Sequence, residues 1–227
     1  MSSGTLPQRV RLFIFDHFRE RGVPPVVEQL MTEFTLTRDD AVAVLRDLES
    51  ARHIALVNGT ARILMAFPYS GIATPFRVLS EGRSYFANCA WDAVAFHAMT
   101  HEADVTVESA CHHCAAPIHI QMRDGVATAV EPADTIVYLA LKPTQWWENI
   151  VTTCSNTMVF FASKEHRDAS DLCASPDESA SLTPDDVHAL SGPIYRTKFA
   201  IDYARPGKDE LLAHFAALGL TGPYWSL

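Results

Sequence analysis

The chain has 227 residues, 48% of them hydrophobic, and a formal net charge of −9 at neutral pH. This length fits one large domain or two small ones around a buried core, and the acidic balance argues against broad nucleic-acid binding, which needs a basic surface. No apolar run reaches membrane-spanning length and the N-terminus lacks the charged and apolar regions of a secretory signal, so we expect a cytoplasmic protein with no membrane or nucleic-acid partner.

Three helices are predicted at the N-terminus. Apolar residues recur at helical spacing in residues 7–22, and a second helix fits residues 24–34. A third helix begins at Thr37, whose hydroxyl can cap the amide of Asp40.

A hairpin follows these helices. Residues 54–57 and 61–65 are apolar and flank an Asn58-Gly59 turn, which is typical of two antiparallel strands. Three helices and a two-stranded wing predict a winged-helix-like domain over residues 1–65. Its third helix is net acidic, which disfavours DNA binding and favours a structural or docking role.

The remainder reads as a linker and a second domain. Residues 66–80 contain prolines and a glycine that break regular structure, and we expect this linker to pack on the second domain. Residues 81–227 are predicted to form a mixed α/β domain with a largely antiparallel sheet, which makes the fold class α+β. A helix is predicted from Ser84 to about Thr100. Strands are predicted at residues 105–109, 117–122, 126–130, 136–141 and 157–161, and later helices begin at residues 183 and 209.

Cys89 and Asp92 are the first candidate site. In a helix, residues three apart lie on one face, so the thiol and the carboxylate could meet. A neighbouring carboxylate raises the pKa of a thiol and does not activate it by charge. Asp92 is therefore better suited to carry a proton from the thiol to a leaving group. The alternative is a buried cysteine in an apolar helix.

The remaining cysteines leave several interpretations open. The pair in Cys111-His-His-Cys114 fits half of a zinc site, but the sequence holds no second such pair. A structural zinc, a redox pair and a plain tight turn before the hairpin at Pro117 are the alternatives, of which the turn is favoured. Cys154 precedes an apolar strand and could point into a cleft or pack in the core. With five cysteines and no signal peptide, we expect reduced thiols.

Taken together, these segments resemble the organomercurial (alkylmercury) lyases. The resemblance covers most of residues 7–163 and weakens beyond. The features that carry it are the helical N-terminal region, the Phe67-Pro-Tyr-Ser-Gly71 and Thr74-Pro75 linker, the Asn88-Cys-Ala-Trp-Asp92-Ala stretch, the Ser109-Ala-Cys111 segment, the Val130-Glu-Pro132 step, and a cysteine shortly before Phe160-Phe-Ala-Ser163.

The resemblance implies an enzyme of mercuric resistance that detoxifies organomercurials. Such enzymes cleave the carbon–mercury bond by protonolysis, giving a hydrocarbon and mercuric ion, with small thiols as partners and no organic cofactor or bound metal. By carry-over, Cys89 and Cys154 would ligate mercury, which prefers soft thiolates. Asp92, also beside the mercury, would shuttle the proton. Cys111 would be structural.

The sequence departs from the family pattern at the second catalytic cysteine. Ser155 stands where that cysteine is expected, and Cys154 lies one residue earlier. In a strand, one residue turns a side chain to the opposite face, so either a bulge or loop end re-aims Cys154 or the second thiol is absent from the site. The alternatives to a lyase are a non-catalytic or divergent family member that binds a thiophilic metal, and a winged-helix regulator that senses metal or redox state through its thiols.

Overall fold

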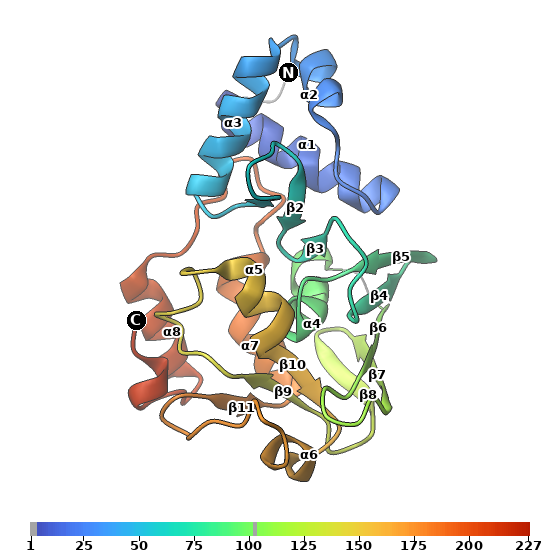
Figure 1. The fold of residues 1–227 in the computed structure, drawn as a ribbon, viewed down its shortest axis with the longest axis vertical. Helices are drawn as coiled ribbons and strands as arrows, with labels where there is room; N and C mark the ends of the chain where they lie inside the picture. The colour runs from blue at the N-terminus through green and yellow to red at the C-terminus, as the bar shows by residue number, and fades with distance from the viewer. Residues whose placement is uncertain (1–3, 102–103) are drawn as a thin grey trace.

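The N-terminal part of the chain is a three-helix layer. The computed structural model describes residues 4–101 and 104–227, and the first three residues of the chain lie outside it. The helices are α1 (Leu6–Arg21), α2 (Val27–Phe34) and α3 (Arg38–Ser50) (Figure 1). The predicted cap of α3 is present, since the amide of Asp40 donates to the Thr37 hydroxyl at 3.2 Å.

The exposed face of α3 is not basic. It carries aspartates as well as arginines, and Arg38 and Arg46 pair with Glu28 and Glu49. A phosphate backbone would meet no continuous positive surface on this helix.

A three-stranded antiparallel sheet follows the helices, in the order β1-β2-β3. Its strands are β1 (Ala55–Leu56), β2 (Ile63–Ala66) and β3 (Tyr69–Ser70). The first two form the predicted hairpin. Strand β3 lies in the stretch that was predicted to be irregular. It forms there because Ser70 and Tyr69 pair with Met65 and Ala66 of β2.

The rest of the chain is built on two further antiparallel sheets. The larger has the order β5-β4-β6-β7-β8 and the smaller has the order β10-β9-β11. The strands of the larger sheet are β4 (Arg77–Ser80), β5 (Arg83–Phe86), β6 (Asp104–Ala110), β7 (Pro117–Arg123) and β8 (Val126–Glu131). Those of the smaller sheet are β9 (Ile136–Leu139), β10 (Met158–Phe161) and β11 (Ala180–Leu182).

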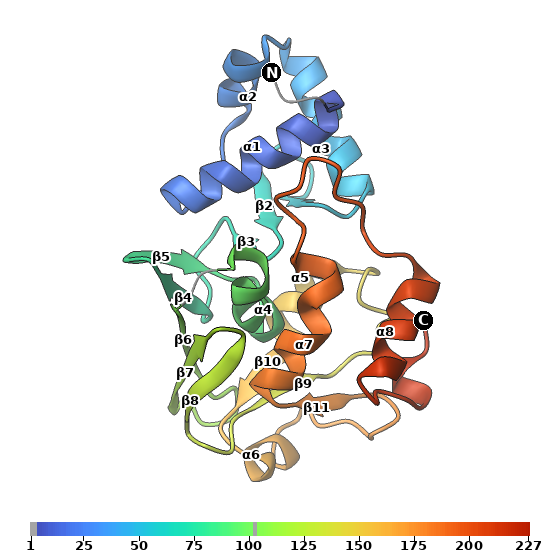
Figure 2. The same ribbon diagram turned by 180° about the vertical axis from the view of Figure 1, so that it is seen from behind.

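Two helices, α4 (Ala90–Thr100) and α7 (Pro184–Tyr195), pack against each other and against these sheets (Figure 2). All residues of α4 up to Met99 are buried. The other elements are α5 (Ile150–Thr152), the π-helical turn η1 (Thr153–Thr157), α6 (Lys164–Asp168), α8 (Lys208–Ala217) and the 3-10 turn η2 (Pro223–Trp225). None of the helices within the described residues is long and apolar enough to cross a membrane.

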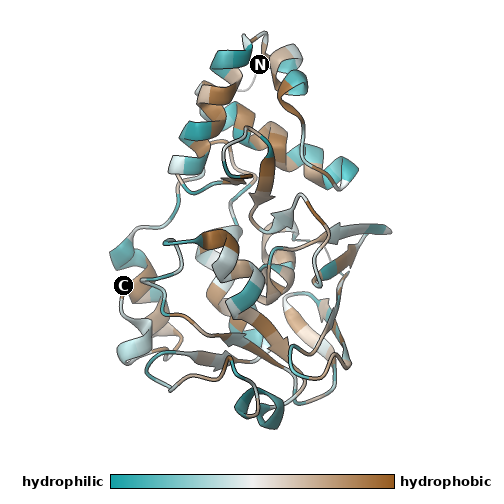
Figure 3. Cartoon of the chain, in the orientation of Figure 1, coloured by the Kyte–Doolittle hydropathy of each residue, from teal (hydrophilic) through white to brown (hydrophobic). Residues whose placement is uncertain are grey.

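The hydrophobic core runs continuously from the N-terminal helices into the sheets. Tyr69 is fully buried, stacks on Phe18 of α1 at 5.1 Å between ring centroids, and meets Phe96 of α4 edge-on at 5.2 Å. Strand β10 is apolar along its length, whereas the outlying α6 is hydrophilic (Figure 3). The domain boundaries proposed at residues 65 and 80 stay a prediction.

Candidate active site

Cys89 lies immediately before helix α4 and not inside it. The predicted helix from Ser84 is wrong for its first residues, because Ser84 to Phe86 pair with β4 as strand β5. Cys89 is the N-cap, and its sulfur accepts a hydrogen bond from the amide of Asp92 at 3.3 Å. The sulfur thus caps the helix as a Ser or Asp side-chain oxygen does at other helix starts. Cys89 is fully buried.

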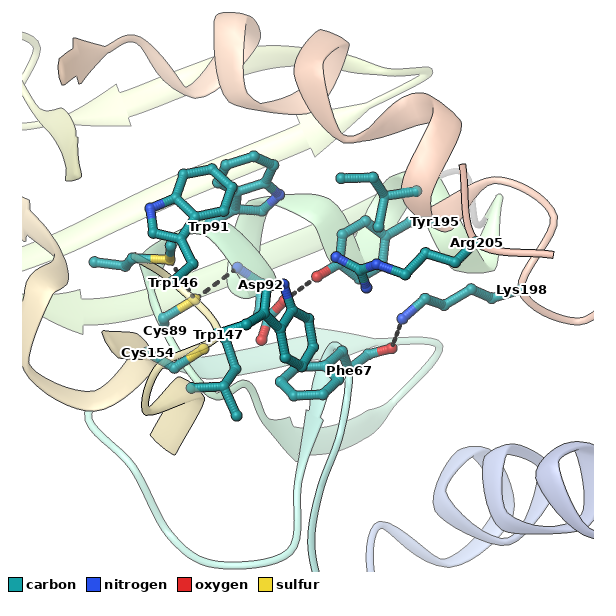
Figure 4. A pocket seen from close by; sticks show the side chains of 13 residues that line it. Phe67, Cys89, Trp91, Asp92, Trp146, Trp147, Cys154, Tyr195, Lys198 and Arg205 are labelled. Carbon is teal, nitrogen blue, oxygen red and sulfur yellow. Dashed lines mark hydrogen bonds between the residues drawn. The ribbon is translucent and has the colours of Figure 1, made fainter. Parts of the chain in front are cut away.

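Asp92 is a buried carboxylate held by two side-chain donors. The amide nitrogen of Asn88 donates to its Oδ2 at 2.9 Å. The hydroxyl of Tyr195 donates to its Oδ1 (Figure 4). Asn88 is itself anchored on the carbonyl of Pro68 at 3.1 Å. These bonds fix the carboxylate on the same side of α4 as the Cys89 sulfur.

Cys154 lies beside these two residues. It belongs to the turn η1, which precedes β10, so the alternation of a strand does not decide where its side chain points. Cys154 is 3% exposed while the neighbouring Ser155 is exposed. The two sulfurs and a carboxylate oxygen of Cys89, Asp92 and Cys154 all lie within 4.8 Å of one another. The helical turn η1 therefore places the Cys154 sulfur beside Cys89 and Asp92.

The three side chains line a small pocket with aromatic walls. Its volume is about 50 Å³. The Sγ of Cys89 also lies 3.8 Å from the Sδ of Met158, a third soft sulfur atom. The lining side chains are Phe67, Cys89, Trp91, Asp92, Trp146, Trp147, Ile150, Cys154, Met158, Ile194, Tyr195, Lys198 and Arg205 (Figure 4).

Burial keeps both thiols in their protonated form. It raises the pKa of Cys89 well above the ordinary value, and Cys154 and the charge on Asp92 act in the same direction. The hydrogen bond from Cys89 lowers the pKa of Cys154, but burial and Asp92 outweigh it and the pKa is raised. A ligand that binds these sulfurs as thiolates must therefore displace their protons.

The carboxylate is also shifted toward its protonated form. Burial raises the pKa of Asp92, while the hydrogen bonds from Tyr195 and Asn88 and the charge of Lys198 oppose that rise. A carboxyl group balanced in this way can both accept and release a proton.

A buried lysine, Lys198, also lines the pocket. The Nζ of Lys198 donates to the carbonyl of Phe67 at 2.6 Å. Burial lowers its pKa to about 7, with the nearby charge of Asp92 opposing the shift. The guanidinium of Arg11 donates to the carbonyl of Lys198, which ties helix α1 to the segment after α7.

Sequence reasoning missed Tyr195 and Lys198. Both lie at or just after the C-terminal end of α7, in no recognisable motif, and Tyr195 is 103 residues from its partner Asp92. Asn88 belongs to the motif, but no pattern in the sequence indicates that its side chain donates to Asp92. Cys111 and Cys114, as expected, form a tight turn before β7, closed by a hydrogen bond from the amide of Ala115 to the carbonyl of Cys111 at 2.8 Å.

Comparisons with known proteins indicate an alkylmercury lyase. The family described as alkylmercury lyase (MerB) matches residues 69–196. Among solved structures, the mercury-bound form of MerB2 aligns with a TM-score of 0.70 and 18% sequence identity, over 86% of this chain and 91% of that chain, which shows a shared fold. No curated protein matches. Because the family match spans more than half of the residues, this chain belongs to the alkylmercury lyase family and is an enzyme of that class.

Proposed function

We propose that this enzyme cleaves the carbon–mercury bond of an organomercurial with Cys89 and Cys154 as the mercury ligands and Asp92 as the proton carrier. The observation that carries the proposal is the convergence of these three side chains within 4.8 Å in one buried pocket. Two thiols and one carboxylic acid are the groups that protonolysis needs.

Mercury reaches the site as a complex of an organic group and a small thiolate. Cys89 replaces that thiolate on mercury, and its proton leaves with the departing small thiol. Soft mercury makes this exchange favourable because it prefers sulfur ligands. In this exchange the bond from mercury to the small thiolate breaks, a bond from mercury to the Cys89 sulfur forms, and the proton moves from Cys89 to the small thiol.

Cys154 then binds the same mercury atom and its proton passes to Asp92. The second thiolate increases the electron density on mercury and weakens its bond to carbon. Asp92 delivers the proton to the carbon as that bond breaks, which releases the hydrocarbon and leaves mercuric ion between two thiolates. Two small thiols remove the ion by exchange and return one proton to each cysteine.

The surrounding residues favour this proton transfer. Phe67, Trp91, Trp146 and Trp147 line the pocket, and such an apolar lining favours transfer of the proton from Asp92 directly to the bound carbon. Tyr195 and Asn88 hold the carboxylate in one orientation, which is a requirement for efficient transfer.

The test is release of hydrocarbon from a phenylmercury compound in the presence of excess thiol. We expect turnover by the wild type and none by Cys89→Ser, because an alcohol neither ionises easily nor binds mercury well. Serine is a good N-cap, so helix α4 remains capped in this variant and loss of activity is not loss of fold.

Cys173→Ser is the matched control. Cys173 is an exposed free thiol outside the pocket, and its removal should leave turnover unchanged. Full activity in Cys89→Ser would rule out the assignment.

A further inference from the structure

A second cluster of soft ligands lies away from the active site. Cys111 is buried after the end of β6, Cys114 is exposed in the turn that follows, and His166 lies half-buried in α6. Their ligand atoms lie within 4.8 Å of one another. We call these three residues the CCH cluster.

The CCH cluster and the catalytic cluster lie at opposite ends of strand β10. Met158 at the start of β10 contacts the Cys89 sulfur. Beyond its other end, the amide of Ala162 donates to the sulfur of Cys111 at 3.3 Å. Four residue steps in a strand span about 13 Å, so one metal ion cannot bind to both clusters.

The distances in the CCH cluster are those of a metal site. The sulfurs of Cys111 and Cys114 are each 3.6 Å from the same ring nitrogen, Nδ1 of His166. Zinc bonds of about 2.3 Å to sulfur and 2.0–2.1 Å to nitrogen, in tetrahedral geometry, put the sulfur and nitrogen atoms about 3.6 Å apart.

Hydrogen bonding alone explains the arrangement less well. A ring nitrogen offers either one lone pair or one N–H, so Nδ1 of His166 cannot form two good hydrogen bonds with the two thiols. Convergence of both sulfurs on one nitrogen is what three ligands around a shared ion require.

The backbone holds the three ligands in position. The turn from Cys111 to Cys114 is closed by a second hydrogen bond, from the amide of Cys111 to the carbonyl of Ala116 at 2.8 Å. Ser163 caps the helix of His166, whose amide donates to the Ser163 hydroxyl at 3.3 Å. The Ala162 amide on the Cys111 sulfur is the kind of supporting hydrogen bond that orients a metal ligand.

We propose that Cys111, Cys114 and His166 form a second metal site, which binds Zn²⁺. Two thiolates and an imidazole are ligands for a soft or borderline cation and not for Mg²⁺ or Ca²⁺. The fourth ligand is water or His113, which is exposed and whose ring centroid lies 5.5 Å from that of His166. By joining the turn before β7 to α6, the ion stabilises the far end of β10.

The experiment is zinc titration of the full chain, reduced and stripped of metal, against a coloured chelator. The comparison is between the wild type, His166→Ala and Cys114→Ser. Both changes are at residues that are not fully buried, so the variants should fold. Loss of one ligand should weaken zinc binding at this site by at least about tenfold, and zinc should raise the melting temperature of the wild type but not of His166→Ala.

Two variants serve as matched controls. Cys173→Ser and His119→Ala remove an exposed thiol and an exposed imidazole outside the CCH cluster, and both should bind zinc like the wild type. Hydrocarbon release by His166→Ala should also equal that of the wild type, because His166 does not line the catalytic pocket.

Two outcomes would overturn the proposal. One is that the wild type, His166→Ala and Cys114→Ser all bind the same number of zinc ions with the same affinity. The other comes from a parallel titration with Hg²⁺, the product of the lyase reaction. A site that depends on His166 and takes Hg²⁺ but not Zn²⁺ would be a mercury-binding site and not a zinc site.

Discussion

Replacing Tyr195 by phenylalanine tests whether Asp92 acts as a proton carrier. The change removes only the hydroxyl that donates to Oδ1 of Asp92 and leaves the buried ring in place. Burial already raises the pKa of Asp92, and the hydrogen bond from Tyr195 lowers it. Without that bond the pKa rises further, and the ionised form that takes the thiol proton becomes scarcer.

The size of the effect follows from the strength of this hydrogen bond. A hydrogen bond to a charged group contributes about 1.5–3 kcal/mol, and each 1.36 kcal/mol changes an equilibrium tenfold. On the acidic side of the profile, activity of Tyr195→Phe should therefore be about 10- to 100-fold below that of the wild type. At alkaline pH, where Asp92 is ionised in both proteins, the difference should shrink.

The assay is kcat for hydrocarbon release, measured from acidic to alkaline pH for both proteins. Tyr138→Phe is the control, because the Tyr138 hydroxyl is engaged with the carbonyl of Leu172 and the amide of Ala174, outside the pocket. A ratio of variant to wild-type activity that does not change with pH would refute the reasoning. It would mean that Tyr195 supports the fold of the pocket and not the ionisation of Asp92.

Three further changes test separate parts of the structure. Asp92→Asn should bind the organomercurial but cleave it about 10²–10⁴-fold more slowly, as seen by comparing mercury bound per chain with single-turnover hydrocarbon release. Cleavage by this variant at the wild-type rate would contradict the proton-carrier role. Cys154→Ser leaves one thiolate, so turnover should be lost and the mercuric ion retained per chain after thiol washing should fall; retention equal to the wild type would remove Cys154 from the ligand set. Thr183→Ala removes the hydroxyl that accepts from the amide of Asp186 at 3.1 Å, and urea unfolding should show a loss of about 1 kcal/mol with unchanged kcat; an unchanged unfolding free energy would mean that this cap contributes nothing.

Much of the secondary structure was predictable because its causes are local. The start of α3 was predicted from the Thr37 cap, and the hairpin of β1 and β2 from its Asn58-Gly59 turn. Each depends on residues a few positions apart. The start of α4 was predicted wrongly, since strand β5 forms by pairing with β4 and the composition of residues 84–89 alone does not reveal that partner.

The candidate site was predictable in part for the same reason. Cys89 and Asp92 are three residues apart, and their contact needs only the first turn of α4. The side on which Cys154 lies could not be derived, because it depends on a helical turn before β10. The sequence left a bulge, a loop end and loss of this thiol from the site as open alternatives. His166 was missed as a partner of Cys111, because 55 residues separate them.

The sequence by itself determined the chemistry that this protein has available: soft thiols, a carboxylate one turn from the first of them, and an acidic chain with a family resemblance in its motifs. Tertiary structure alone decided which of the groups far apart in the sequence meet. It brought Cys154 to Cys89 and Tyr195 to Asp92. The physical reason is that local hydrogen bonds and periodicity act over three or four residues, whereas these contacts depend on the burial of apolar side chains from α4, α7 and β10 in one core.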